Sequence, residues 1–238
     1  MDFNFEEYLN YGNWLGAPRD VKFFKSPKIV VRQILSGNNL SIIASYKEAE
    51  IYFTQIGFSL IARENSNKNL KYILALLNSK AINFYHKYKY LDLEKNTFTK
   101  ILIANCKKFP IPDIKADKQI PFINFVDYLL YLNNKYSEQI FTHTSNERLA
   151  AHIEDVLNMM VYELYFEKHM KEVGIDVLQF MKPKPIANAK NNEEKAEEIK
   201  KFYLWIQTPD NQVGQRINPD YIGIKSPNII SKINLATQ

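Results

Sequence analysis

The chain contains a single cysteine, Cys106, and only seven glycines among its 238 residues. One cysteine excludes an internal disulfide and any zinc site built from several cysteines. No two glycines are separated by one residue, so the phosphate-binding sequences G-x-G-x-x-G and G-x-x-x-x-G-K-S/T are missing. We therefore expect no cofactor-binding loop and no cofactor in this chain. We interpret Cys106 as a small buried apolar side chain.

Long apolar runs are also missing. No stretch approaches the roughly 18 uninterrupted apolar residues of a membrane helix, and the first residues, MDFNFEEYLNYG, are acidic rather than signal-like. Apolar residues nevertheless make up 46% of the chain, enough for a substantial core. We expect a protein with no membrane segment, located in the reducing cytoplasm, where a free cysteine is stable.

Sequence motifs for catalysis are weak. Asn218-Pro219-Asp220-Tyr221 differs from the Asn-Pro-Pro-Tyr element with which adenine methyltransferases hold a flipped base, because Asp220 replaces the stiffening second proline. We interpret this segment as a turn. Pro112-Asp113 and Glu193-x-Lys195 imitate a magnesium nuclease motif, but they lie 80 residues apart and we interpret the match as chance.

The four histidines give no better indication of a metal centre. None of the compact ligand spacings of metal sites is present, so we expect ordinary surface or core histidines. The residues are His86, His143, His152 and His169. We therefore expect no complete catalytic site in this chain. The alternative is that the chain contains a nuclease or methyltransferase centre that these motifs do not reveal.

Positive charge is concentrated in the first half of the chain. Between Arg19 and Lys108 there are sixteen Lys and Arg against six Asp and Glu, a surplus of ten positive charges. Because the whole chain carries +5, the remainder sums to −5. This asymmetry indicates a localised face that binds a polyanion. The alternative is an ordinary solvated lysine surface.

The first half alternates β-branched and apolar segments with turn residues. We predict strands over residues 28–35, 40–46, 51–56 and 58–63, and a hairpin turn at 36–39 between the first two.

The period then changes to that of a helix, which we predict over residues 70–88 with Asn67 or Asn69 as its N-cap. A further short strand is predicted over residues 100–104. Regular structure is excluded at Phe109-Pro110-Ile111-Pro112, because the two prolines remove backbone donors and restrict their neighbours.

Beyond these prolines the chain is predicted to be helical. We expect one helix from about residue 121, where a proline is tolerated in the first turn, and a long helix over 146–173 that ends at Gly174. Residues 181–192 have the composition of a linker, and residues 193–206 are predicted to form a final charged helix.

Three segments carry a resemblance to a known family. They are Pro27 to Ile34, Leu70 to Lys80 and Phe109 to Pro112, and Gly12-x-Trp14 precedes them. Their order and spacing resemble the TaqI-like C-terminal specificity domain, which follows the methyltransferase in many N6-adenine methyltransferases and fused type IIG restriction–modification enzymes. The resemblance continues to about residue 175.

The resemblance implies an α+β fold with a mixed, β-rich DNA target recognition domain over residues 1–115. A helical spacer and docking region over 116–180 and a linker with a helical tail over 181–238 follow. The implied function is sequence-specific recognition of double-stranded DNA for a methyltransferase, and in some enzymes also a nuclease, that lies upstream in the same polypeptide.

The same resemblance implies that this chain is not an enzyme alone but part of a site-specific adenine DNA methyltransferase or restriction endonuclease. The parent would use S-adenosylmethionine, and magnesium where a nuclease is attached, while this chain holds neither. The alternatives are an unrecognised catalytic centre or a basic protein-interaction scaffold.

Candidate DNA contacts follow from the chemistry of the basic segment, because no individual contact carries over from a family whose reading loops vary. Lysines neutralise phosphates, whereas arginine and glutamine can pair with the edges of guanine and adenine. We predict base reading by Arg19, Arg32 and Gln33. The phosphate-contacting candidates are Lys22, Lys25, Lys87, Lys89 and Lys95. Alternatively, Arg32 and Gln33 are strand residues that face solvent or a neighbouring strand.

Overall fold

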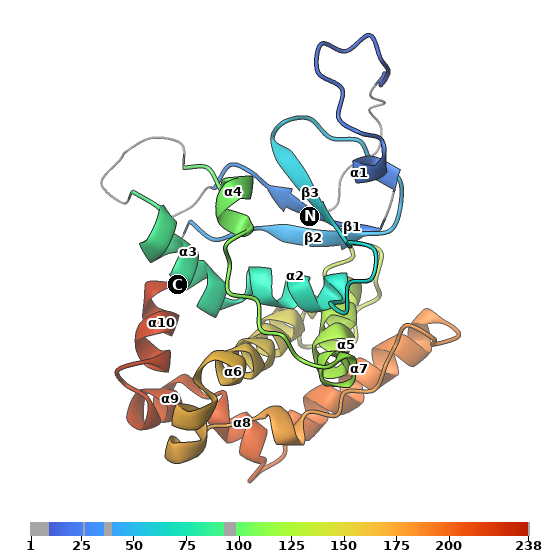
Figure 1. Ribbon diagram of the computed structural model, residues 1–238. Coiled ribbons are helices and arrows are strands. Elements are labelled where there is room, and N and C mark those ends of the chain that lie inside the picture. The colour runs from blue at the N-terminus through green and yellow to red at the C-terminus, as the bar shows by residue number, and fades with distance from the viewer. Residues whose placement is uncertain (1–9, 26, 36–39, 93–98, 238) are drawn as a thin grey trace.

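The computed structural model describes residues 10–25, 27–35, 40–92 and 99–237. They form a small antiparallel sheet covered by helices, which confirms the predicted α+β class (Figure 1). Among the described residues, no helix is both long and apolar enough to cross a membrane.

The sheet has three strands in the order β2-β1-β3, with β1 (Lys28–Arg32) in the centre. Its neighbours β2 (Ala44–Lys47) and β3 (Gly57–Ile61) both run antiparallel to it. Ile29 and Val31 point to the same buried face. The predicted pairing of the first two strands is confirmed, and their predicted turn lies outside the described residues.

The predicted strand over residues 51–56 is wrong. Tyr52 and Phe53 pack on Phe24 of the short helix α1 (Lys22–Lys25) instead of joining the sheet. The ring of Tyr52 stacks on Phe24 at 4.7 Å between centroids, and Phe53 meets Phe24 edge-on at 5.3 Å. The backbone N–H of Ile51 donates to the Phe24 carbonyl at 3.1 Å. Local aromatic packing therefore replaces strand pairing here.

The predicted strand over residues 100–104 is also wrong. Lys100 makes one isolated bridge to Ile34, and the chain then turns into α4 (Ile103–Cys106). Ile101 is fully buried, but the next residue, Leu102, is exposed. Because Ile101 is buried but Leu102 and Ile103 are exposed, this segment does not continue as a strand beyond the single bridge.

The helix predicted over residues 70–88 is two helices, α2 (Leu70–Asn78) and α3 (Lys80–Tyr90). Ser79 separates them with an extended backbone. Its hydroxyl donates to the Leu76 carbonyl at 2.6 Å and accepts from the Ile82 N–H at 3.3 Å, so one side chain ends α2 and begins α3. Of the two predicted N-cap candidates, Asn69 caps α2, because its side chain accepts from the Lys71 N–H.

The next helix, α5 (Ala116–Leu132), begins five residues before the predicted start at Pro121. The cause is Gln119, which is buried and fixes the first turn against the start of α2. Its amide oxygen accepts from the Asn69 N–H at 2.9 Å, and its amide nitrogen donates to the Asn67 carbonyl at 2.8 Å. These two contacts between distant segments hold the turn that precedes the proline.

The long helix α6 (Asn146–Val173) has the predicted limits. The Ser145 hydroxyl caps its first turn by accepting from the Arg148 N–H at 3.3 Å. Gly174 ends it with a positive φ of 74°, a conformation that favours glycine. Both ends are therefore set by local sequence. Phe166 has non-helical angles and marks a kink within the helix.

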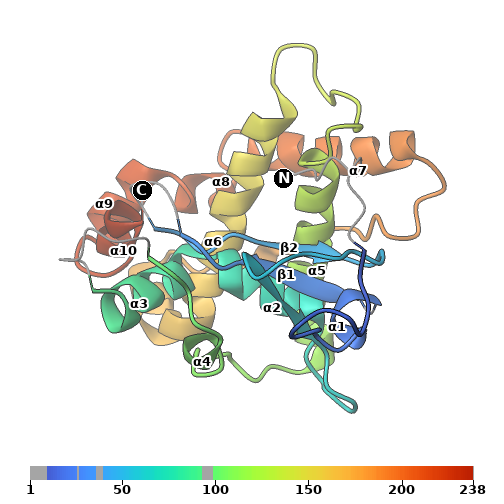
Figure 2. The same cartoon turned by 90° about the horizontal axis from the view of Figure 1, so that it is seen from above.

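Helix α2 lies between the sheet and the pair α5 and α6 (Figures 1 and 2). One hydrophobic cluster runs without interruption from Ile29 in the sheet through Leu76 to Phe125 and Val156. The core therefore continues across the predicted domain boundary at residue 115. The division into domains stays a prediction.

The C-terminal region is irregular over residues 181–191, where a linker is predicted, and continues as α7 (Asn192–Ile206), close to the predicted limits. Three short helices follow, beyond the helix over residues 193–206 that was predicted to be the last one of the helical tail. They are α8 (Gln212–Arg216), α9 (Pro219–Lys225) and α10 (Ile230–Ala236). The segment predicted as a turn begins α9, because the Asn218 side chain accepts from the Asp220 N–H at 2.8 Å.

Helix α10 folds back against α3 and α6. The Tyr162 hydroxyl donates to the Asn234 side-chain oxygen at 2.8 Å, and the Lys87 ammonium donates to the Ala236 carbonyl at 2.9 Å. The tail is thus part of the packed structure and helps to hold α3.

Candidate nucleic-acid interface

Three predicted base-reading residues lie together at one end of the sheet. Arg32 is the last residue of β1 and lies opposite Gly57 of β3, whose carbonyl accepts a hydrogen bond from the Arg19 guanidinium at 2.9 Å. The next residue, Gln33, donates its backbone N–H to the Ile56 carbonyl at 2.8 Å. We call these five residues the Arg32 end of the sheet. The structure thus brings Arg19 next to Arg32 and Gln33.

Arg19 is half-buried and partly anchored. Its guanidinium lies 5.7 Å from the centroid of the Phe53 ring, and the Tyr11 hydroxyl donates to its backbone carbonyl. A guanidinium carries five N–H donors, so the bond to Gly57 leaves donors for a ligand. Arg19 therefore fixes its own segment to the sheet and can still contact an acceptor.

Arg32 and Gln33 are also half-buried, and their side chains are less engaged than that of Arg19. In the part of the chain that the structure describes, the Arg32 side chain has no hydrogen-bonded or ion-paired partner. The backbone of Gln33 is held on both sides, because its carbonyl also accepts from the Ile101 N–H at 2.9 Å. The backbone of Gln33 is therefore fixed, while the N–H donors of the Arg32 and Gln33 side chains remain available for a ligand.

The two lysines of α1 are exposed beside the β3 edge. The Ser59 hydroxyl donates to the Phe23 carbonyl at 2.9 Å and holds α1 in place. Lys22 forms an ion pair of 3.0 Å with Asp20, and the backbone N–H and ammonium of Lys22 lower the pKa of that carboxyl. Lys25 ends the helix and is exposed.

The predicted lysines of α3 lie in another part of the molecule. Lys87 is half-buried and contacts the end of α10, which lies on the opposite side of the protein from α1 (Figures 1 and 2). Lys89 is exposed in the last turn of α3. Lys95 lies outside the described residues. The seven described candidates therefore form at least two separate groups, and Lys87 already donates to the C-terminal end of α10.

Three exposed lysines near the Arg32 end were not singled out from the sequence. Lys100 pairs with Ile34, one residue beyond Gln33, and Lys107 and Lys108 follow α4. Residues 99–112 contain these three lysines and no acidic residue. A run of charge of one sign without compensation is the signal that could have identified them.

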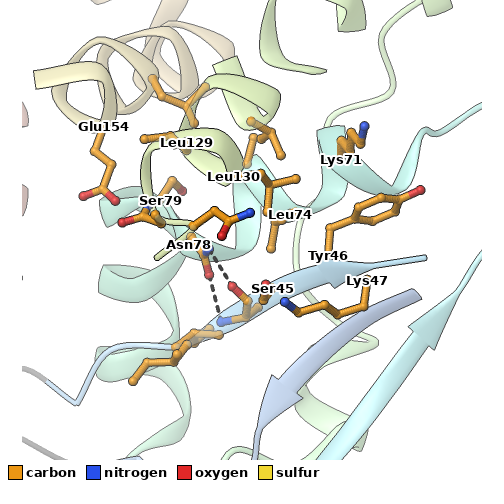
Figure 3. A pocket seen from close by; sticks show the side chains of 18 of the residues that line it. Ser45, Tyr46, Lys47, Lys71, Leu74, Asn78, Ser79, Leu129, Leu130 and Glu154 are labelled. Atoms are coloured by element: carbon orange, nitrogen blue, oxygen red, sulfur yellow. Dashed lines mark hydrogen bonds between the residues drawn. The ribbon is translucent and has the colours of Figure 1, made fainter. Parts of the chain in front are cut away.

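A groove of about 700 Å³ lies between β2 and the helices α2, α5 and α6 (Figure 3). The Asn78 amide pairs with the outer edge of β2, accepting from the Ala44 N–H at 3.2 Å and donating to its carbonyl at 3.0 Å. Lys71 forms an ion pair of 2.6 Å with Asp127. The lining includes two lysines and two glutamates, so the groove has no excess of positive charge for a polyanion.

The described residues contain no group of three or more His, Cys, Asp and Glu suited to a metal ion. His86 is a core histidine, in line with the sequence interpretation. It is fully buried, neither ring nitrogen has a hydrogen-bond partner, and burial lowers its pKa to about 4. Cys106 is half-buried, and burial raises the pKa of its thiol to about 11, so the reactive thiolate is disfavoured.

Comparison with known proteins identifies a matching protein family. Residues 2–111 match the model of the TaqI-like C-terminal specificity domain. This confirms the resemblance over the first half of the chain, up to the proline-rich segment that ends the basic region. No solved structure gives a significant match.

A relative from Methanocaldococcus jannaschii, provisionally named a type II restriction enzyme and methyltransferase, is 24% identical over 163 residues. The alignment covers 68% of this chain but 13% of that relative. The chain thus spans only a small part of the length of that relative.

Proposed function

Because residues 2–111 match the model of the TaqI-like C-terminal specificity domain, we propose that this chain recognises a specific sequence in double-stranded DNA. The observation that carries the proposal is the arrangement at the Arg32 end of the sheet. Two arginines and a glutamine, whose side chains can pair with base edges, lie there beside exposed lysines that suit phosphates.

The residues divide by chemistry and position. Arg19, Arg32 and Gln33 are the proposed base readers. The proposed phosphate contacts are Lys100, Lys107 and Lys108, which lie in and after the segment hydrogen-bonded to Gln33, and Lys22 and Lys25 on α1 beside β3. Lys89 and Lys95 are proposed as further phosphate contacts on a longer DNA. Lys87 is retained only as a long-range contributor to the positive field, because its ammonium binds the end of α10.

The partner of this module is proposed to be an adenine-specific methyltransferase in the same polypeptide, with a nuclease where the enzyme also cleaves. The relative from M. jannaschii is named both a restriction enzyme and a methyltransferase, which supports this arrangement. In this arrangement S-adenosylmethionine and magnesium bind to those domains and not to this chain. The helical region over residues 116–180 holds ten Asp and Glu against five Lys and Arg, a net charge of −5. This supports the proposal, since negative charge suits packing against protein better than contact with DNA.

The test measures binding of the 238-residue chain to a pool of fluorescent 24-base-pair duplexes of random sequence, by anisotropy from 50 to 300 mM KCl. Each neutralised phosphate contributes about −0.9 to the slope of log affinity against log salt. We expect a slope of about −3 to −5 for four or five lysine contacts. Binding that is absent, or that does not depend on salt, would refute the proposal.

The location is tested with the double variant Lys107→Glu and Lys108→Glu. We expect its slope to become shallower by about two and its affinity to fall for every sequence. The matched control is Lys168→Glu with Lys182→Glu, which makes the same charge change at exposed lysines outside the specificity domain. If both double variants weaken binding equally, the effect comes from net charge and the proposed face is wrong.

A further inference from the structure

Three exposed apolar side chains belong to the segments that pair with Gln33 at the Arg32 end of the sheet. Ile56 is 60% exposed, Leu102 is 50% exposed and Ile103 is 45% exposed. They come from two segments that are both hydrogen-bonded to the backbone of Gln33, through Ile56 and Ile101. We call Ile56, Leu102 and Ile103 the apolar ridge.

The ridge does not stabilise the fold locally. Leu102 is the N-cap of α4 and makes no side-chain cap hydrogen bond. Serine, threonine, aspartate and asparagine stabilise this position, whereas leucine is among the least favourable residues there. Ile103 follows in the first turn and is exposed as well. A position that breaks a local rule of stability without a packing gain is typical of a binding surface.

The surroundings of the ridge are basic. Lys100 precedes Leu102, and Lys107 and Lys108 follow α4, with no acidic residue over 99–112. Arg32 directly precedes Gln33 and adds a further positive charge. An apolar strip bordered by cations complements a groove of duplex DNA, where phosphates line the rims and base edges form the floor. A protein partner with an apolar patch would have no need of this border of lysines.

We propose that the apolar ridge enters the major groove and contacts thymine methyl groups beside the base read by Gln33. The 5-methyl group of thymine is the one apolar group on the base edges of that groove. The proposal rests on the proposed function, because it requires that this face bind DNA. It adds Ile56, Leu102 and Ile103 as specificity-determining residues and thymine as the base they select.

The experiment uses the 238-residue chain and duplexes with ten randomised central base pairs. Bound duplexes are recovered and sequenced for the parent and for the double variant Leu102→Ser and Ile103→Ser. The control is Ile224→Ser with Leu235→Ser, which removes two apolar side chains from α9 and α10 that are even more exposed (77% and 66%) than those of the ridge. Because serine is a good N-cap, the ridge variant should melt at the same temperature as the parent or higher.

We expect the parent and the control variant to enrich one motif that contains a thymine. The ridge variant should lose the preference at that thymine, bind the parent motif about tenfold more weakly, and keep the salt slope of the parent. Replacing that thymine by deoxyuridine, which lacks the methyl group, should weaken the parent and leave the ridge variant unchanged.

The two failures are distinguishable. If the parent shows no salt-dependent binding and enriches no motif, the proposed function fails. If the parent enriches a motif and the ridge variant enriches the same motif with the same affinity, DNA recognition stands and the role of the ridge is refuted. Loss of binding to all sequences with a shallower slope would likewise refute base contact by the ridge, because it would indicate a disturbed phosphate contact.

Discussion

His86 gives the sharpest prediction about stability, because protonating a buried ionisable group that has no hydrogen-bond partner costs free energy. Its ring lies 5.8 Å from Phe109 and 6.2 Å from Tyr90, measured between centroids. Neither nitrogen is hydrogen-bonded. We predict that the substitution His86→Phe, which keeps a flat ring and removes both nitrogens, makes the protein more resistant to acid.

The magnitude follows from the pKa of His86, which burial lowers from 6.5 to about 4. The folded protein keeps the ring neutral at a pH where the unfolded chain binds a proton. Stability is therefore intact above about pH 6.5 and falls as the pH drops towards 4. The two titration curves give a loss of about 2 kcal/mol at pH 5 and about 3 kcal/mol below pH 4.

The assay is urea unfolding followed by circular dichroism at pH 7.5 and pH 5.0, for the parent and His86→Phe. Carboxyl groups that titrate in this range affect both proteins, so the difference between them isolates His86. At pH 7.5 the variant should be at least as stable, since phenylalanine leaves no buried nitrogen without a partner. If both proteins lose the same stability between the two pH values, the imidazole does not impose the cost inferred from its burial.

Two further predictions concern the helical core and the missing cofactor. Val161 is fully buried in α6, so Val161→Asp should cost a few kcal/mol of unfolding free energy, whereas aspartate in place of the exposed Ala151 of the same helix should cost little; equal melting of both variants would contradict the burial. The chain should not bind S-adenosylmethionine, because it has no glycine-rich cofactor loop. A calorimetric signal for micromolar binding would disprove that expectation.

Local sequence was sufficient wherever a single side chain decides a boundary. Ser145 and Gly174 delimit α6 through a cap and a left-handed turn, and both act on neighbouring residues only. The central strand β1 was predictable for a similar reason, because its apolar and β-branched residues are buried and fit a sheet. These signals remain visible without knowledge of the rest of the fold.

Distant contacts overrode the pattern elsewhere. Residues 51–53 have the composition of a strand, but the rings of Tyr52 and Phe53 pack against Phe24 of another segment in an aromatic cluster. The start of α5 depends on Gln119, whose two hydrogen bonds reach Asn67 and Asn69. Patterns in the sequence carry no information on which distant segment competes for a side chain.

For the site, the sequence by itself determined the chemistry: the surplus of positive charge over Arg19 to Lys108 and the order of motifs shared with the specificity-domain family. Only the tertiary structure decided which of those charges are available together. In the folded protein Arg19 donates to the carbonyl of Gly57, which is paired with Arg32. Lys87 instead donates to the carbonyl of Ala236, 149 residues away. Charge is a property of each residue, whereas a binding face requires side chains from separate segments to share one surface, and packing alone arranges that.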